Sequence, residues 1–294
     1  IDNTILYNKR GLYLKNIEGL TLKNNFICHR DEDITLTNNQ NPIEQTIFNT
    51  GNQNIEGYNF STPAANSHFL LDEQSSQNIA NTGSDATVSL EINTQGGGEI
   101  TKGFFDSQIG YSFKFNTTNN GSLNLVNANN SSPYAGPTQG AARSFAFWVK
   151  PEEAIFQTFM YSGGPNDGEV FTIQMEAAGV VRVTDNNQNF VRMADMTLTI
   201  GSWNHVVVTV PSNNTLNSIQ FYKNGVASNE TYSGTNPLIN TASNGINFFP
   251  RYKGLASDIR YFDYKLCSSE VESVFNDRRN TLSIDENPIN ETLK

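Results

Sequence analysis

Between residues 110 and 262 the chain is built from short runs in which apolar and polar residues alternate. A period of two is typical of β-strands with one buried face. Breakers rich in Gly, Asn and Asp separate the runs, and Asn224-Gly225 favours a type I′ hairpin turn. Regular short strands of this kind predict an antiparallel β-sandwich. The expected strands are Tyr111–Phe115, Ser122–Val126, Ser144–Val149, Phe156–Tyr161, Val170–Glu176, Val180–Thr184, Met196–Ile200, His205–Val210, Ile219–Lys223, Gly245–Phe249 and Gly254–Phe262.

One helix is expected near the end of the chain. Ser269 and Glu272 form a capping-box pair, and Val271, Val274 and Phe275 recur on one face. The residues that follow are polar, and we assign 279–294 to a polar C-terminal tail.

The first 60 residues repeat with a longer period. The run Leu12–Asn16 recurs as Ile34–Asn38, and Ile5-Leu6 recurs as Ile27-Cys28, each 22 positions later. Short strands with Asn at the turns and this period indicate coils of a right-handed parallel β-helix. We interpret residues 1–62 as the end of such a β-helix; a hairpin region with an accidental period is the alternative.

Composition supports an all-β chain and excludes some partners. Charged residues are only 16% of the chain, and Phe (19) and Tyr (11) supply much of the apolar content. The net charge is -10 without any basic stripe, so we expect no nucleic-acid partner. No apolar stretch is long enough to span a bilayer, so we expect no membrane insertion.

Several blocks, in order along the chain, resemble the strands of laminin-G-like domains, which are jelly rolls of the concanavalin-A-like class. These blocks are Ser67–Glu73, Gly110–Phe115, Ser144–Pro151, Ser202–Thr209, Phe221–Gly225, Tyr252–Phe262 and Leu266–Val271. The second resembles a Gly-x-x-x-x-Phe strand, and the fourth resembles a Trp-x-His strand. The resemblance covers residues 64–276 and implies a jelly roll, which we assign to residues 63–278.

Some residues in these blocks have an expected structural role. Trp148 and Trp203 are expected to fill the core of the sandwich. His205 shares a face with Trp203 and is expected to be structural rather than a ligand or base. Asp258 and Arg260 share a face of the last strand, so a structural charge pair is one reading of them.

Catalytic signatures are scarce in the sequence. Related glucanases carry Glu-x-Asp-x-x-Glu on one strand, and residues 64–276 show no such pattern. Zinc-protease, nucleophile-elbow and P-loop motifs do not occur either. The acidic triplet Asp31-Glu32-Asp33 is interpreted as a solvated turn, with a lyase-like role as the alternative. We therefore expect no catalysis from this chain.

The resemblance implies a structural calcium ion, since such jelly rolls often carry one. Asp106 and Asp258 are the first candidates for its ligands, because the topology can make them neighbours. The loop that holds Asn166, Asp167 and Glu169 is a second option, and ordinary turn formation is the alternative for each.

We expect an extracellular module, secreted or displayed on a cell or virion surface, that binds a polysaccharide or cell-surface glycan. Sugars are held by aromatic faces together with amide, carboxylate and guanidinium groups. Candidate residues, selected as loop residues, are Tyr161, Asn166, Asp167, Asn187, Phe190 and Arg251. Two alternatives stay open: the C-terminal part of a β-helical polysaccharide lyase or hydrolase, and a subunit of a surface filament or viral fibre that contacts copies of itself.

Overall fold

The computed structural model describes residues 62–73, 79–94, 98–117, 121–164, 166 and 168–285, together with the backbone of five short strands before residue 49. Side chains are described from residue 62 to residue 277 within these ranges.

The five early strands pair in parallel. One sheet has the order β1 (Thr4–Asn8), β3 (Leu22–His29), β5 (Gln45–Phe48), and β2 (Leu12–Lys15) pairs with β4 (Ile34–Thr37). Ile5 lies opposite Ile27, and Leu12 lies opposite Ile34, which is the spacing of the sequence repeat. The connecting residues lie outside the described ones, so the β-helix stays a prediction.

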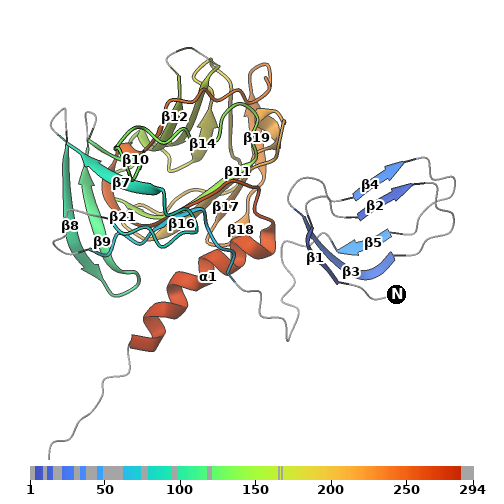
Figure 1. Cartoon of the computed structure of the whole chain (residues 1–294), viewed down its shortest axis with the longest axis horizontal. Helices are drawn as coiled ribbons and strands as arrows, with labels where there is room; N and C mark the ends of the chain where they lie inside the picture. Colours follow the sequence, from blue (N-terminus) through green and yellow to red (C-terminus); the bar gives the residue numbers. More distant parts are fainter. Residues whose placement is uncertain are drawn as a thin grey trace, which may run out of the picture.

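The rest of the chain folds into two antiparallel sheets, packed as a sandwich (Figure 1). In sheet 1 the order is β19-β15-β14-β13-β12-β20-β10-β7, and in sheet 2 it is β18-β17-β16-β11-β21-β9-β8, with β6 also paired to β21. The strands of sheet 1 are β7 (Val88–Asn93), β10 (Ser122–Asn127), β12 (Gln157–Gly163), β13 (Val170–Met175), β14 (Val181–Thr184), β15 (Phe190–Met193), β19 (Glu230–Ser233) and β20 (Ile246–Arg251). Those of sheet 2 are β6 (Ser67–Phe69), β8 (Glu99–Asp106), β9 (Gly110–Asn116), β11 (Arg143–Pro151), β16 (Asn204–Val210), β17 (Gln220–Lys223), β18 (Val226–Ala227) and β21 (Lys253–Phe262). A 3₁₀ turn, η1 (Leu216–Ser218), precedes β17.

Ten of the eleven expected strands are present, and the prediction for Met196–Ile200 was wrong. This segment is not a strand, although Leu198 is buried and Met196 and Ile200 pack against the core. Its backbone makes isolated hydrogen bonds instead: the Leu198 N–H donates to Gly179 O in a turn, and the Thr199 N–H donates to the side chain of Asn204 at the start of β16. The alternation of apolar and polar residues in this segment indicates that its apolar side chains are buried, but the segment does not pair with a neighbouring strand.

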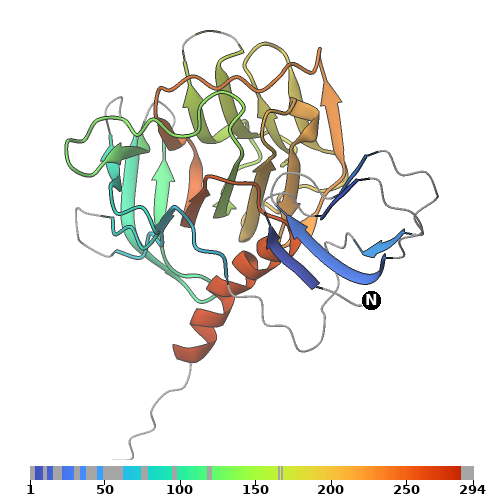
Figure 2. The ribbon, with the colours of Figure 1, turned by 45° about the vertical axis from the view of Figure 1, so that its right-hand side comes forward.

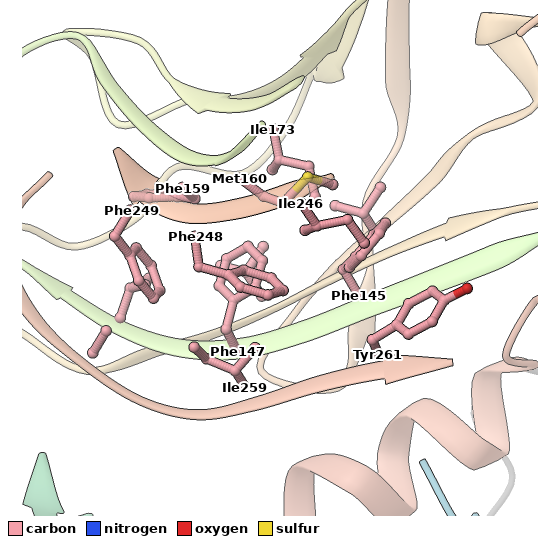
Figure 3. Packing of buried hydrophobic residues seen from close by; sticks show 14 of the residues in the cluster. Phe145, Phe147, Phe159, Met160, Ile173, Ile246, Phe248, Phe249, Ile259 and Tyr261 are labelled. Carbon is pink, nitrogen blue, oxygen red and sulfur yellow. The ribbon is translucent and has the colours of Figure 1, made fainter. Parts of the chain in front are cut away.

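Aromatic side chains fill the space between the sheets (Figure 3). Phe145 and Phe147 of β11 point inward from sheet 2, and Phe159 and Phe248 point inward from sheet 1. The rings of Phe147 and Phe159 meet edge to face, with centroids 5.6 Å apart. Such contacts add to the free energy gained by burying apolar surface and fix the two sheets against each other.

Helix α1 (Ser268–Asp285) covers part of the outer face of sheet 2 (Figures 1 and 2). Trp148 faces this helix, because its neighbours Phe147 and Val149 face the core and side chains alternate along a strand. Trp148, Trp203 and Ile109 form a cluster there, and Phe275 of α1 stacks on Trp148 at 5.5 Å. The tryptophans are therefore buried, but the prediction that they fill the core between the sheets was wrong. Among the described residues, no helix is long and apolar enough to cross a membrane.

Candidate functional site

The outer face of sheet 1 carries polar and aromatic side chains. Phe171, Ile173 and Met175 of β13 point into the core, so Thr172 and Gln174 point the other way. The same alternation turns Asn247 of β20 outward between Ile246 and Phe248. Strands from different parts of the sequence thus present one continuous polar surface.

Strand register arranges these side chains in two rows that run across the strands. The first row, from β15 to β10, is Phe190, Thr184, Thr172, Tyr161, Asn247 and Asn124. The second, from β15 to β20, is Arg192, Arg182, Gln174, Thr158 and Arg251. A bulge between Thr158 and Met160 lets Thr158 and Tyr161 share the outer face. One row is therefore mainly aromatic, hydroxyl and amide, and the other is rich in arginine.

A hollow of about 410 Å³ lies over β12, β13 and β20, where the two rows meet. The described residues that line it are Phe156, Thr158, Tyr161, Thr172, Gln174, Asn186, Asn247, Pro250 and Arg251. Two aromatic rings, several hydroxyl and amide groups and one guanidinium thus converge on a single open depression.

The side chain of Arg182 contacts two aromatic rings on this face, that of Phe156 in the hollow and that of Phe190 on β15. The Arg182 guanidinium lies 5.1 Å from the ring centroid of Phe156 and 5.4 Å from that of Phe190. Arg182 also donates to the Gln174 side chain at 3.0 Å, and Glu176 accepts from both Arg182 and Arg192 at 3.2 Å. We call Phe156, Phe190 and Arg182 the aromatic platform. Cation–π contacts and the carboxylate of Glu176 hold its side chains in place, while 45% of Phe156 stays exposed.

Three of the six predicted ligand residues, Tyr161, Phe190 and Arg251, lie on this face. They belong to strands β12, β15 and β20, so the assumption that they lie in loops was wrong. Asn166 instead bonds Glu169 at 2.9 Å within its loop. The Asn187 N–H donates to Asp185, and neither Asn166 nor Asn187 lines the hollow. Asp167 lies outside the described residues.

Sequence reasoning missed several residues of the face. Gln174, Arg182 and Asn247 alternate with core residues in their strands, and that alternation was the available signal, whereas Phe156 precedes β12 beside the exposed Ile155 and carried no such signal. The pattern could show which residues point outward, but not which strands become neighbours.

The two residues proposed as calcium ligands do not fit a calcium site. Asp258 is buried, and its carboxylate is held by Arg260 at 2.8 and 2.9 Å and by His68 at 2.7 Å. Asp106 is paired with Lys150 at 3.0 Å and accepts from the Gln108 N–H. Calcium needs six to eight oxygens, and among the described residues no group of three or more His, Cys, Asp or Glu side chains gathers at either place.

The pKa values of both carboxyls reflect these ion pairs. Burial alone raises the pKa of Asp258, but the charge of Arg260 and the hydrogen bonds from His68 and Arg260 outweigh it and hold the pKa well below its usual range. Burial also raises the pKa of Asp106, and the Gln108 N–H and Lys150 reverse that shift. The pair of Asp258 with Arg260, one of the two sequence-based readings, is present. Calcium bound elsewhere stays a prediction.

Two antiparallel sheets, one covering helix and a polar face on sheet 1 define an all-β jelly roll of the concanavalin-A-like class. Residues 133–272 match a family model described as the concanavalin A-like lectin/glucanases superfamily. No curated protein matches the chain.

Solved structures support the same fold. Domain 4 of AbnA, an extracellular arabinanase from Geobacillus stearothermophilus solved with arabinotriose, is 18% identical, with a TM-score of 0.51 over 72% of this chain and 98% of that one. The binding domain of botulinum neurotoxin serotype C1 is 13% identical, with a TM-score of 0.50 over 73% of this chain and 52% of that one. The binding domain of botulinum neurotoxin DC, solved with rat synaptotagmin II, is 14% identical, with a TM-score of 0.50 over 74% and 52%. At these identities the likeness concerns the fold.

Proposed function

We propose that this chain is an extracellular carbohydrate-recognition module that binds an oligosaccharide on the outer face of sheet 1. The observation that carries the proposal is the hollow in which Phe156 and Tyr161 converge with hydroxyl and amide side chains. A sugar ring has an apolar face that packs on an aromatic ring and hydroxyls that bond to polar groups at its edge.

The extent of the face suits a chain-like ligand. From Phe190 on β15 to Asn247 on β20 the first row crosses four strand steps, or about 19 Å at roughly 4.8 Å per step. That length accommodates several linked sugar units. Most of the side chains along it belong to strands, so the surface is formed before the ligand arrives and little ordering entropy is lost on binding.

The AbnA domain adds support, because that protein was solved with arabinotriose and nearly its whole length aligns with this chain. The lining of the hollow includes no carboxylate among the described residues, and the nearby Glu176 is held by two arginines. Glycoside hydrolysis uses a pair of carboxyl groups, and the described residues of the hollow do not supply one. Recognition without cleavage is therefore the function that this face supports.

The test is binding of the full 294-residue chain to a panel of soluble polysaccharides, measured by affinity electrophoresis and titration calorimetry. The panel contains neutral arabinan, xylan and galactan and acidic polygalacturonate, alginate and carrageenan. We expect retardation by at least one polymer and loss of that retardation in Tyr161→Ala. Phe105→Ala is the matched control, because Phe105 is an exposed aromatic residue of β8 in sheet 2. If no polymer retards the wild-type chain, or if both variants lose binding equally, the proposal is wrong.

A further inference from the structure

Arg251 is the one charged side chain among the described residues that line the hollow. It ends strand β20 and is exposed to solvent, and its guanidinium has no hydrogen-bond or ion-pair partner within the part of the chain that the structure describes. The neighbouring strand places Thr158 opposite it, and a threonine cannot neutralise its charge.

The basic residues nearest to Arg251 on this face and on the following strand are neutralised. Arg182 and Arg192 share Glu176, and Lys253 is paired with Glu153 two positions beyond Arg251. The chain as a whole carries 29 acidic against 19 basic residues. An acidic protein that keeps an unpaired guanidinium in its sugar-sized hollow, where no described residue contributes a carboxylate to the lining, presents a local positive site to a ligand.

We infer that the saccharide bound in this hollow is anionic, and that its carboxylate or sulfate group pairs with the Arg251 guanidinium. This inference rests on the proposed function and names the class of its ligand. The planar guanidinium offers two parallel N–H donors that match the two oxygens of such a group.

The position of Arg251 relative to the aromatic residues agrees with this assignment. Arg251 lies opposite Thr158 and Asn247 lies opposite Tyr161, so the guanidinium is one row away from the Tyr161 ring. The rows are three residues apart on β12 and four apart on β20, which is roughly 10–13 Å along the strands. A sugar packed on Tyr161 can therefore place a charged substituent of the same or the adjoining unit at Arg251.

The experiment compares charged and uncharged forms of one polymer skeleton. The full chain is titrated with polygalacturonate fragments, with the same fragments after methyl esterification, and with carrageenan fragments as the sulfated arm. The neutral members are arabinan, xylan and galactan fragments. Each titration is repeated with Arg251→Gln and with Lys265→Gln, which removes one positive charge beside α1, a helix that packs on the opposite sheet.

We expect an acidic polymer to bind at least about tenfold more tightly than every neutral one, and the Arg251→Gln variant to lose that advantage. Lys265→Gln should retain it. Preference for polygalacturonate would identify a carboxylate, and preference for carrageenan a sulfate. Equal or tighter binding of neutral polymers, or an acidic preference that survives in Arg251→Gln, would overturn the inference and leave the proposed function standing. Absence of binding to every polymer would overturn both.

Discussion

Arg260 holds Asp258 through two parallel hydrogen bonds, from Nε to Oδ1 at 2.8 Å and from Nη2 to Oδ2 at 2.9 Å, and both side chains are almost fully buried. His68 of β6 contacts the same carboxylate, and Asp277 of α1 contacts the same guanidinium. One buried pair thus connects an inner strand of sheet 2 to an edge strand and to the covering helix.

Replacement of Asp258 should be costly because it leaves Arg260 buried with only Asp277, a half-exposed carboxylate, as its counter-ion. We expect Asp258→Asn to lower the free energy of unfolding by about 3 kcal/mol or more, measured by chemical denaturation. Asp106→Asn, which breaks a less buried pair with Lys150, should cost about 1 kcal/mol or less.

The calcium prediction is tested by the same proteins. A cation that binds only the folded state raises stability by mass action, so its removal lowers the melting temperature. With Asp106 and Asp258 engaged by basic side chains, neither variant should change the response to a chelator. A chelator could instead lower the melting temperature of the wild type but not that of Asp258→Asn. That result would show that Asp258 binds a cation in addition to pairing with Arg260.

His205 should make the fold sensitive to mild acid. The imidazole contacts the rings of Trp148 and Phe275, and its burial lowers its pKa to about 3. Between pH 6.5 and 3 the unfolded chain binds a proton that the folded chain does not, so stability is complete above pH 6.5 and is lost as the pH falls. From pH 7 to pH 4 we expect His205 to account for a loss on the order of 3 kcal/mol.

Denaturation curves of the wild type and of His205→Phe at several pH values measure this contribution. The variant cannot titrate at this position, so its stability should fall less steeply over the same interval, whatever its stability at pH 7. Parallel curves for the two proteins would contradict the prediction, because the remaining carboxyl groups titrate in both.

Helix α1 should depend on the stacking of Phe275 on Trp148, whose rings are inclined by only 24°. We expect Phe275→Ala to destabilise the fold by about 2–3 kcal/mol and to expose the tryptophans to water. A red shift of tryptophan emission reports the exposure. Ser273→Ala, a substitution in the same helix, should change neither quantity, and an unshifted emission in Phe275→Ala would contradict the packing of α1 described above.

Arg182 should matter for binding more than for folding. Its guanidinium orients Phe156 and Phe190 from a partly exposed position, and exposed pairs contribute little to stability. We expect Arg182→Met to weaken saccharide binding by about tenfold while the free energy of unfolding changes by about 1 kcal/mol or less. Unchanged affinity in calorimetry would mean that the platform takes no part in binding.

The sequence predicted the central strands well and the edges poorly. Strands β11 and β16 were recognised because both of their faces are buried and their residues are mostly apolar, whereas β8, β15 and β19 were missed because they are short or largely exposed. Trp148 was assigned to the wrong face because the chain does not reveal that a helix covers the outside of sheet 2. Large apolar residues are expected on both faces of such a strand.

The site was harder to predict for a related reason. Tyr161 and Arg251 come together only because β12 pairs with β20, a strand far away in the sequence. Local alternation can turn each residue outward, but the order of strands in a sheet depends on long-range pairing. The sequence therefore indicated candidate residues one at a time. Their arrangement in two rows follows from the pairing register of the strands, which the sequence does not reveal.

The most direct test of the proposed site is a crystal structure of the chain with an oligosaccharide from the polymer that binds most tightly. We predict sugar rings against Tyr161 and Phe156, lying across β12, β13 and β20, with polar contacts to Gln174 and Asn247. A ligand bound instead at the loop of Asn166, at the Asn187 turn or on sheet 2 would contradict the account.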